Sequence, residues 1–490
     1  MAQSVWRFSR YKILIEKVGF KMSVVFGGKT ISKPGAYSII TREDTTPSSF
    51  GSAQVLAFIA GPDDVSAESL AVKDKVLWFN NFTDAKASLK SGNLLNYMSI
   101  AWSPTKDQGA LGADLIAIVI CTAATSANFT TALTLLRKEN IQGIIPITTL
   151  KSIQALVKDH VVDMSGVKLR KERRAFFGTD KLSTIASAAG LGATATAIVS
   201  EGVVTGVQVT DGGAGYLVPP TVVVDGVGTG AEFVAVVDGG KVVSITVSAG
   251  GTGYTVAPTL SFTYSDPRLA DERIIDEVEA HVLAAGTERT SILVGGIKKY
   301  VDGQLLSTDG VGFAAAVAGM WAGKKTPIDP VTFDELDIVG LEYEVEDVEP
   351  LLEAGGIPAE VTYGENRKPK YRVVDAITAN GGDLAVETTI DEMNKILRRE
   401  MEDEFVGKVT GDPKSVSTSK FNKFISLLNT FVRQGWLVES TDENSGDVIP
   451  AYKDVVMIKE GKSTRFTWWG KVAEPDNYIL IDSHIAVSSN

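Results

Sequence analysis

The sequence contains few of the residues from which active sites and metal sites are usually built. Of its 490 residues only one is cysteine, Cys121, so a disulfide framework within the chain and a multi-cysteine metal site are excluded. Three residues are histidine: His160 and His281 fall on expected helices, and His484 in an expected final strand. A serine hydrolase needs a histidine beside an activated serine and a carboxylate, and the chain has no G-x-S-x-G motif. We therefore expect no enzyme activity, no catalytic residue, no cofactor and no metal site.

Basic side chains and long apolar runs are also scarce. The chain has 48 Lys and Arg against 60 Asp and Glu, and this net charge of −12 argues against a nucleic-acid-binding protein. No run of 18 apolar residues occurs, so no transmembrane helix is expected. The first 21 residues lack the continuous apolar region and the cleavage site of a signal peptide. We expect the product to stay in the cytoplasm in which it is made.

The beginning of the chain suggests a second translation start. Glu16 and Lys17 must be encoded by GAR-AAR, which resembles a ribosome-binding site a few codons before Met22. Residues 1–22 are therefore a possible non-native leader, and a short basic N-terminal extension is the alternative. A peptide containing Trp6 in the mass spectrum of the native protein would exclude the later start.

A stretch of small apolar residues runs from Val311 to Ala322. It holds about a dozen Ala, Gly and larger apolar residues, fewer than the roughly 20 that a membrane-spanning helix needs, so it predicts a buried helix. Its alanines and glycines leave no bulky face, which lets neighbouring backbone pack closely against it. Gly323, Pro327 and Pro330 follow and should end the helix.

The chain on either side of this stretch alternates short apolar runs with helical patterns. The runs suit strands that are covered on both faces, and they lie at 55–60, 115–120, 143–148 and 291–294. Asn128 is a candidate cap for a helix that ends at Leu136. Further strands are expected at 341–345 and 371–378, with a helix at 348–354 between them. The alternation predicts an α/β region with a mostly parallel sheet.

Two short motifs could bind phosphate or an acidic partner. GGKT at residues 27–30 resembles part of a phosphate-binding loop, but Ser23 stands where the motif needs glycine, and Pro34 breaks the segment that should be helical. We therefore reject nucleotide binding. Residues 167–174, VKLRKERR, carry five basic side chains and one acid. We interpret them as a solvated helix face or a gatekeeper beside the next domain, and a subunit contact with an acidic neighbour is the alternative.

Composition changes sharply after Arg174. From there to Arg268 only Lys181 and Lys241 are basic, while Gly, Val and Thr dominate. Alternating Val, Ile and Thr predict strands, and the glycines predict turns. We therefore expect an inserted all-β domain at 194–264 that loops out of the α/β region and faces solvent.

The inserted domain contains a repeat. The segment that begins at Gly202 returns at Gly240, and the two GGxGY turns place Tyr216 and Tyr254 38 residues apart. A calcium-binding nonapeptide roll would need aspartate where these tyrosines stand, so calcium binding is not expected. We interpret the repeat as inert decoration, and adhesion to cell surfaces is the alternative.

The last hundred residues predict two helices, a hairpin and a final strand. The first helix should begin at a capping box from Thr389 to Glu392, and it carries an apolar stripe of Ile390, Met393, Leu397, Met401 and Phe405. The second helix should follow the cluster Ser417–Ser419 and end before Gly435. The hairpin strands are expected at 455–458 and 464–469, and the final strand at 478–487.

Several of these motifs together resemble contractile tail sheath proteins of bacteriophages and of related injection machines. The small-residue helix and loop from Gly310 to Leu336 are similar to the sheath "AG" helix and the loop after it. REMEDEFVGK from Arg399 and FVRQGWL from Phe431 are similar to the ends of two helices in the C-terminal sheath domain. The resemblance covers roughly residues 23–190 and 266–490 and leaves the repeat out.

The resemblance implies an α/β (α+β multidomain) fold. Its parts would be a subtilisin-like α/β sheath core, a C-terminal α+β sheath domain with extended terminal arms, and the inserted all-β repeat module. The expected divisions are the leader 1–22, an N-terminal arm 23–45, an outer α/β region 46–193, the β module 194–264, the sheath core 265–380, the C-terminal sheath domain 381–475 and a C-terminal arm strand 476–490.

The resemblance also implies a structural function. Such a subunit polymerises as stacked hexameric rings around the inner tail tube, and its contraction drives the tube through the host envelope for genome ejection. Expected partners are further copies of the chain, the tail tube protein, and the baseplate and tail terminator proteins, with no nucleic acid and no membrane insertion. The expected location is the tail sheath of a virion assembled in the host cytoplasm. The sheath of a bacteriocin or of another contractile injection system is one alternative, and a surface adhesin that uses the GGxGY module is another.

In sheath proteins the terminal arms join each subunit to its neighbours. A projecting strand leaves backbone N–H and C=O groups that a neighbour's sheet edge can satisfy, and a head-to-tail contact of this kind extends into a helical tube. The residues assigned to the C-terminal arm are Tyr478, Ile479, Leu480, Ile481, Ile485 and Val487. Lys420 and Lys423, near the start of the second C-terminal helix, are candidates for contact with the tube.

Overall fold

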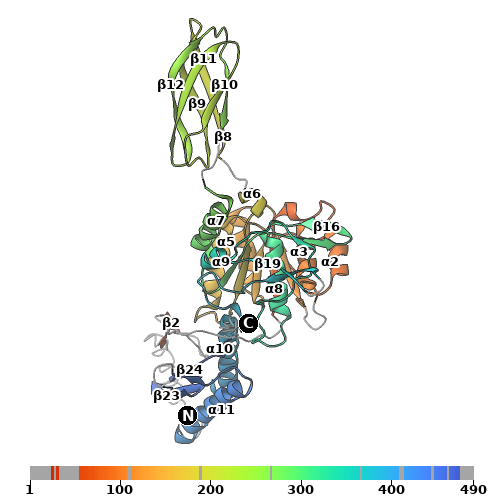
Figure 1. Ribbon diagram of the computed structural model, residues 1–490. Helices are drawn as coiled ribbons and strands as arrows, with labels where there is room; N and C mark the ends of the chain where they lie inside the picture. The colour runs from red at the N-terminus through yellow and green to blue at the C-terminus, as the bar shows by residue number, and fades with distance from the viewer. Residues whose placement is uncertain are drawn as a thin grey trace, which may run out of the picture. The chain divides into compact units, whose positions relative to one another are not determined.

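The computed structural model describes residues 24–26, 29–31, 54–106, 112–186, 190–264, 268–364, 367–407, 413–442, 446–460 and 463–474 (Figure 1). The chain divides into two compact units. The smaller unit is Asp180–Glu279, and the larger unit contains the chain on both sides of it. Among the helices described, none combines the length and the apolar composition that crossing a membrane requires.

Seven strands form the central sheet in the described part of the larger unit, in the order β18-β14-β7-β6-β3-β5-β4. Their bounds are β3 Leu56–Ala60, β4 Val76–Phe79, β5 Ile116–Ile120, β6 Gly143–Pro146, β7 Arg174–Gly178, β14 Thr290–Leu293 and β18 Gly356–Ile357. Neighbouring strands run parallel except at β4, an antiparallel edge strand beside β5. The α/β class and the mostly parallel sheet that the apolar runs predicted are confirmed.

Helices cover both faces of this sheet (Figure 1). Their bounds are α2 Phe82–Leu89, α3 Asn93–Trp102, α4 Ser126–Leu136, α5 Lys151–Ser165, α7 Ala270–Ala285, α8 Gly310–Gly323 and α9 Glu349–Glu353, with a 3₁₀ turn η1 at Pro62–Asp64. Leu56, Phe58 and Ala60 of β3 lie in the core with α3 and α8. Ala57 and Ile59 lie in the opposite core with α4 and α5. Because both faces of β3 are buried, its sequence is a continuous apolar run.

Helix α8 is buried along its length except for its last residue, as predicted. The carboxylate of Asp309 caps it by accepting the N–H two residues later, at 3.0 Å. A Cβ atom added to Gly319 would lie 2.4 Å from the carbonyl oxygen of Ala101 in α3. A Cβ on Gly178, at the end of β7, would lie 2.1 Å from the backbone of Gly310. The small residues thus let α8 pack directly on neighbouring backbone.

Two smaller sheets of the larger unit consist, among the described residues, of β16-β15-β17 and β19-β20. Their bounds are β15 Ile297–Val301, β16 Gln304–Ser307, β17 Gly340–Leu341, β19 Ala359–Tyr363 and β20 Pro369–Val373. The strand expected at 341–345 is wrong beyond Leu341, and the strand expected at 371–378 ends at Val373. In the second case the chain leaves the sheet after Val373 and then turns, with the N–H of Thr378 donating to the carbonyl of Gly382 at 2.6 Å. A local alternating pattern does not guarantee a neighbour with which to pair.

The cap predicted for α4 is also wrong. Thr125, rather than Asn128, is the capping residue, and its hydroxyl accepts the N–H of Asn128 at 3.4 Å. The helix therefore begins three residues earlier than Asn128 would allow, although it ends at Leu136 as expected.

The smaller unit is mostly β structure in two repeats. Besides the first part of α7, its elements are α6 Leu182–Ala186, β8 Leu191–Ser200, β9 Val203–Ala214, β10 Thr221–Asp225, β11 Thr229–Asp238, β12 Lys241–Thr252 and β13 Thr259–Thr263. The first residues of β8, β9 and β10 (191, 203, 221) return 38 residues later as those of β11, β12 and β13 (229, 241, 259). Each repeat therefore includes one strand before the sequence match at Gly202 and Gly240.

The two repeats are interlocked. Strand β13 of the second repeat lies between β10 and β8 of the first. The N–H of Tyr216 donates to the carbonyl of Gly240 at 3.1 Å, and the N–H of Tyr254 donates to that of Gly202, also at 3.1 Å. Each GGxGY turn is thus hydrogen-bonded to the turn between the first two strands of the other repeat.

The C-terminal part of the larger unit comprises α10 Leu384–Phe405, α11 Pro413–Arg433, β21 Ser440–Thr441, β22 Val448–Ile449, β23 Tyr452–Glu460 and β24 Ser463–Gly470. The predicted hairpin is confirmed as β23–β24. The capping box at Thr389 is wrong, because Asp383 caps α10 and Thr389 lies fully buried inside the helix. Helix α11 begins at Pro413, before Ser417–Ser419, since proline suits the first turn of a helix.

At the other end of the chain, β1 (Val24–Phe26) and β2 (Lys29–Ile31) form an antiparallel pair. The residues after Gly28 are therefore a strand, where a phosphate-binding loop would lead into a helix. The structure is thus in keeping with the rejection of nucleotide binding.

Candidate assembly site

The carboxyl ends of the parallel strands are where an α/β enzyme usually places its catalytic groups. Here that edge holds the start of α8. The hydroxyl of Tyr97 donates to the carboxylate of Asp309 at 3.0 Å, and burial, with the charge of Asp309, raises the pKa of Tyr97. The hydroxyl of Thr179 accepts the N–H of Gly295 at 3.0 Å. These groups hold α8 in place, and the described residues contain no cluster of three or more potential metal ligands.

Two of the three histidines lie in the described part of the chain, and both are buried inside helices. Nε2 of His160 in α5 lies 2.8 Å from Nη1 of Arg173, and burial together with the Arg173 charge lowers the pKa of His160 to about 3. Nδ1 of His281 in α7 lies 2.7 Å from Oε1 of Gln154, whose amide donates to the carbonyl of Gly178. Both histidines help to pack helices against β7. His484 lies outside the described residues.

The basic run at 167–174 is not a solvated helix face, which corrects the sequence interpretation. Arg173 and Arg174 are 1% and 2% exposed. The guanidinium of Arg173 donates to the carbonyls of Leu136 and Glu139 at 2.8 and 2.7 Å. The acidic neighbour of Arg174 belongs to the same chain: it is α10.

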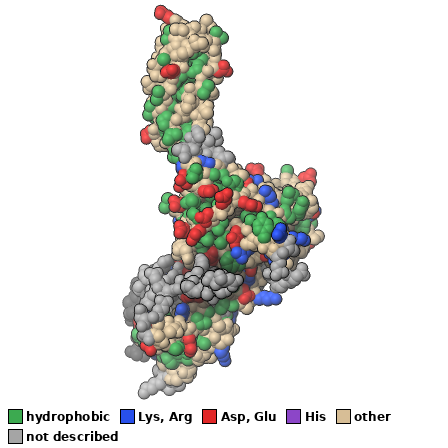
Figure 2. All heavy atoms as spheres, viewed as in Figure 1, with side chains coloured by type: hydrophobic (Ala, Val, Ile, Leu, Met, Phe, Trp, Pro, Cys, Tyr) green, Lys and Arg blue, Asp and Glu red, His purple; other side chains and the backbone are tan. Residues whose placement is uncertain are grey.

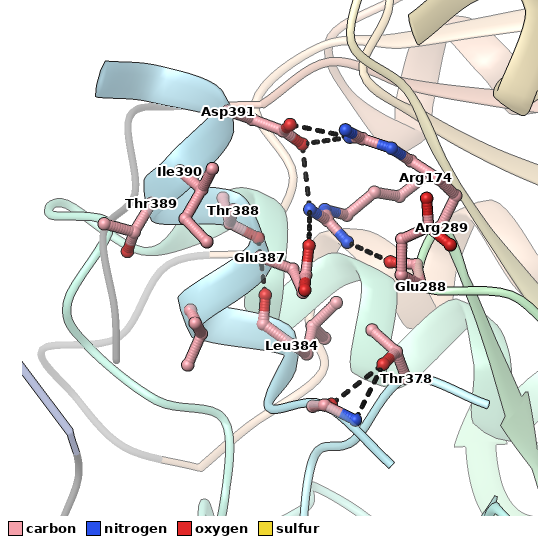
Figure 3. Close-up of polar contacts among 12 residues, drawn as sticks. Arg174, Glu288, Arg289, Thr378, Leu384, Glu387, Thr388, Thr389, Ile390 and Asp391 are labelled. Atoms are coloured by element: carbon pink, nitrogen blue, oxygen red, sulfur yellow. Dashed lines mark hydrogen bonds and ion pairs between the residues drawn. The ribbon is translucent and has the colours of Figure 1, made fainter. Parts of the chain in front are cut away.

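Arg174, Arg289, Glu387 and Asp391 form a buried charge cluster between the central sheet and α10 (Figure 3). Nη1 of Arg289 lies 2.6 and 2.5 Å from the two carboxylate oxygens of Asp391. Nη2 of Arg174 lies 2.8 Å from Asp391 and 3.6 Å from Glu387, while its Nη1 donates to the carbonyl of Glu288 at 2.9 Å. The four residues are 2–7% exposed and carry two charges of each sign. Burial would raise the pKa of Asp391, but Arg289 and Arg174 hold it below its usual value.

Further ion pairs continue along the same helix. Arg398 of α10 lies 2.5 Å from Glu172, and both side chains are buried. Glu402 lies 2.9 Å from Arg170. At the start of the helix, Nε1 of Trp321 in α8 donates to the hydroxyl of Thr388 at 2.8 Å. The acids and the arginine on α10 recur at 387, 391, 398 and 402, a spacing that places them on one helix face. The sequence carries this charged stripe beside the apolar stripe of the same helix, and its signal is the spacing of four and seven residues.

The apolar side of α10 contacts the rest of the C-terminal part. Met393 and Leu397 lie in one core with Leu428 and Phe431 of α11. The ring of Phe424 in α11 stacks on Phe466 of β24 with a centroid distance of 4.4 Å. Helix α10, helix α11 and the hairpin β23–β24 therefore form one layer, which we call the C-terminal layer.

The outward face and the two outer edges of the hairpin are open in the described part of the structure. Val456 and Ile458 are each 48% exposed, and they pair across the hairpin with Thr467 and Arg465. Nζ of Lys453 lies 4.7 Å from the ring centre of Trp469 on the same face. Strands β23 and β24 pair only with each other among the strands described, so each presents an outer edge of N–H and C=O groups. This hairpin is our candidate assembly site.

The predicted arm residues Tyr478, Ile479, Leu480, Ile481, Ile485 and Val487 lie outside the described residues, as does most of the N-terminal arm at 23–45. Lys420 and Lys423 lie on α11. Lys423 contacts Glu400 and Glu404 of α10 at 3.0 and 3.2 Å, and Nζ of Lys420 lies 3.4 Å from the hydroxyl of Thr464. Tube contact by these lysines remains a prediction.

Hydrophobic side chains reach the surface of the smaller unit (Figure 2), and the large ones that are exposed are all aliphatic in its described part. Val227 and Val256 are 68% and 66% exposed. Each of the five aromatic side chains between residues 191 and 264 is buried or half-buried, Tyr216 and Tyr254 most deeply. The tyrosines that stand where a calcium roll has aspartate thus fill the apolar interior. Adhesion to cell surfaces through this module remains a prediction.

Comparison with known proteins found similarity in structure alone. No family model matches the sequence, and no curated protein matches it. Of the solved structures, a chain of the contracted helical sheath of the anti-feeding prophage (AFP) aligns with a TM-score of 0.50, at 10% identity, over 93% of this chain and 99% of that one. A chain of the AFP baseplate, solved with sixfold symmetry, aligns with a TM-score of 0.50, at 9% identity, over 92% and 99% of the two chains. The chain therefore has the fold of contractile-sheath proteins, which are structural proteins rather than enzymes.

Proposed function

We propose that this chain is the structural subunit of a contractile sheath. The observation that carries the proposal is the alignment with the AFP sheath chain, which spans nearly all of both proteins. In this proposal the subunits form rings of six, stacked into a helical tube around an inner tube, and contraction drives that tube through the envelope of a target cell. The sixfold symmetry of the matched baseplate supports the ring number. The chain acts without a cofactor, because its work is self-association and movement.

The joints between subunits are formed by strand addition to the hairpin β23–β24. The arms expected at 23–45 and 476–490 extend from their own subunit and pair with the open edges of a neighbour's hairpin. Apolar side chains of the C-terminal arm, among them Tyr478, Ile481 and Val487, pack against Val456 and Ile458. Four or five such side chains, at about 1.5–3 kcal/mol each, stabilise a joint by several kcal/mol after the ordering entropy is subtracted. A joint of this strength persists while the subunits rearrange.

The particle to which the sheath belongs is a bacteriophage tail in our proposal, with genome ejection as its outcome and the tail tube, baseplate and tail terminator proteins as partners. A bacteriocin or another contractile injection system is the alternative. Immunogold labelling of particles from producing cells would separate the two. Label on tails attached to DNA-filled heads supports the phage, and label confined to headless particles supports the alternative.

Lys420 is the cleaner residue with which to test tube contact by α11. Reversal of Lys423 would also break its ion pairs with Glu400 and Glu404, so Lys423→Glu disturbs the helix pair itself. We expect Lys420→Glu to weaken co-sedimentation of the chain with purified inner tubes. Unchanged co-sedimentation would remove α11 from the tube interface.

The assembly proposal is tested by negative-stain electron microscopy of four purified proteins. They are the full chain, a chain that ends at Asp476, the variant Val456→Glu/Ile458→Glu, and the control Leu283→Glu, which places a charge at a residue that is 91% exposed on α7. The full chain and the control should form tubes or rings, whereas the truncated chain and the hairpin variant should stay monomeric. Tubes formed by the hairpin variant would refute the hairpin as acceptor. A full chain that stays monomeric at high concentration would refute self-assembly.

A further inference from the structure

The ion pairs on the charged face of α10 depend on the direction and the distance of each contact, as apolar contacts do not. Asp391 receives the guanidinium of Arg289 on both carboxylate oxygens and that of Arg174 on one of them (Figure 3). Contacts of this kind depend on both direction and distance, whereas apolar surfaces tolerate sliding. From this arrangement we infer that Arg174 and Arg289 are positioning residues, which fix the register and angle at which the C-terminal layer docks on the central sheet.

The two arginines are themselves held rigidly. Arg174 is the first residue of β7, and Arg289 directly precedes β14, the neighbouring parallel strand. The carbonyl of Glu288 accepts from Arg174, so the two strand starts are also joined to each other. The guanidinium groups therefore extend from two paired strands of the central sheet toward one side of α10.

A shift of α10 along its axis would break this match. One helical turn moves a residue by about 5.4 Å, roughly twice the length of the contacts that Asp391 makes. Asp391 would leave both arginines, and Arg398 would leave Glu172. Because these groups are buried, the shift would leave charges without water and without partners, which is strongly unfavourable. The buried charges thus act mainly by making shifted positions of α10 unfavourable, rather than by stabilising the observed position.

Leu384, in the first turn of α10, lies in the core with α8, but the later apolar contacts of α10 fall on a different partner. Met393 and Leu397 face α11, so the hydrophobic effect holds the C-terminal layer together. The side that faces the sheet is ionic along four positions of the helix, from Glu387 to Glu402. One set of side chains therefore holds the C-terminal layer together, and mainly another set fixes its position on the central sheet.

This inference extends the proposed function. If the hairpin accepts a neighbour's arm, the angle of α10 sets where that arm attaches relative to the sheet. The two layers of one subunit then move together during contraction, and the relative movement falls at the arms.

The docking angle can be measured in a single chain, without any assembly. Cys121 is fully buried, so spin labels can be attached to cysteines introduced as Leu283→Cys on α7 and Ser426→Cys on α11, both exposed positions of the larger unit. Double electron–electron resonance on the chain that ends at Asp476 reports the distance between the layers. We expect one narrow distance peak when the charge cluster is intact.

The test variant replaces the four cluster residues by apolar ones: Arg174→Met, Arg289→Met, Glu387→Leu and Asp391→Leu. An apolar replacement of a buried ion cluster commonly preserves folding. We expect native circular dichroism, but a distance distribution at least twice as wide, or one with a second peak. A control variant, Arg170→Met/Glu402→Met, removes the more exposed pair and should leave the peak narrow.

A distribution as narrow as that of the parent in the folded quadruple variant would overturn the inference. Should that variant fail to fold, Arg174→Lys provides the test, because lysine keeps the charge but lacks the two terminal nitrogens with which Arg174 contacts Glu288 and Asp391. Broadening with retained folding supports a positioning role, and an unchanged width refutes it. Since the measurement needs no tubes, its outcome is independent of whether the chain is a sheath subunit.

Discussion

Arg173 and Arg174 are adjacent residues that hold different parts of the fold. Arg173 satisfies the carbonyl ends of α4 and contacts His160 of α5, while Arg174 reaches α10, 217 positions later in the sequence. Both side chains are buried, and burial is tolerated because their Nη atoms have partners inside the protein. A basic run in an acidic chain can therefore make buried contacts between elements of the same chain, rather than form a binding surface.

His160 gives a prediction about pH. Its pKa is about 3 in the folded chain against 6.5 for a free histidine, so below pH 6.5 the unfolded chain binds a proton that the folded chain cannot. This contribution lowers stability as pH falls, and between pH 7 and pH 5 it amounts to about 2 kcal/mol. Glutamine can accept the same bond from Arg173 without titrating. We expect His160→Gln to lose about 2 kcal/mol less than the parent over this interval in urea unfolding.

The other titrating groups are the same in the parent and in the variant, so their contributions cancel when the two losses of unfolding free energy are compared. An equal loss of unfolding free energy in the parent and in His160→Gln would show that His160 does not limit acid stability.

At the scale of elements, α8 packs closely on its neighbours because many of its residues are glycine or alanine. Its glycines meet the backbone of α3 and the end of β7 at distances that no Cβ atom would permit. A helix packed this closely needs small residues on several sides at once, which explains why the sequence has no bulky face there. The apolar run of α8 therefore reflects a position between other elements, not a membrane.

Gly319→Ala tests this packing. The new Cβ would lie 2.4 Å from the carbonyl oxygen of Ala101, so α3 and α8 must separate. Overpacking of this kind costs about 3 kcal/mol, of which the higher helix propensity of alanine returns about 1 kcal/mol. We expect a net loss of about 2 kcal/mol in the free energy of unfolding, measured with urea.

The matched control is Gly381→Ala. Gly381 has φ +84°, and a Cβ atom added there would have no neighbour within 4 Å, so alanine meets backbone strain alone, about 1 kcal/mol. If Gly319→Ala costs no more than this control, the close contact between α3 and α8 is not limiting.

At the scale of the whole molecule, the two compact units differ in what holds them together. The described part of the larger unit combines three apolar cores with a layer of buried ion pairs, whereas the smaller unit contains an interlocked pair of repeats. The chain enters and leaves the repeats at one place. A Cβ on Gly190 would lie 2.4 Å from the ring of Tyr216, and the same ring contacts Tyr264 at a centroid distance of 5.1 Å.

Because its two ends meet at Tyr216, the repeat module should be removable. We expect replacement of residues 191–264 by Gly-Ser-Gly to leave the larger unit folded, with its helical signal retained in circular dichroism. If the chain assembles as proposed, the shortened protein should still form tubes, with less mass per subunit in electron micrographs. Loss of folding would show that the module is integral to the fold.

Local sequence patterns determined much of this architecture. The apolar runs predicted a parallel sheet covered on both faces, the small-residue run predicted a buried α8, and the pattern near the C-terminus predicted the hairpin β23–β24. The 38-residue period predicted two β repeats. In each case the spacing of apolar residues shows which side chains will be buried. That spacing can be read from a short stretch of sequence.

The tertiary structure alone decided which elements meet. The sequence did not reveal that Arg174 faces Asp391, that β13 pairs with a strand of the other repeat, or that α10 begins at Asp383 rather than Thr389. Thr389 looked like a cap because Ser and Thr satisfy helix starts, yet the buried position of the preceding turn let the helix extend backward. A sequence pattern shows that a side chain or a strand will need a partner. Which distant residue or strand becomes that partner depends on how the whole chain packs.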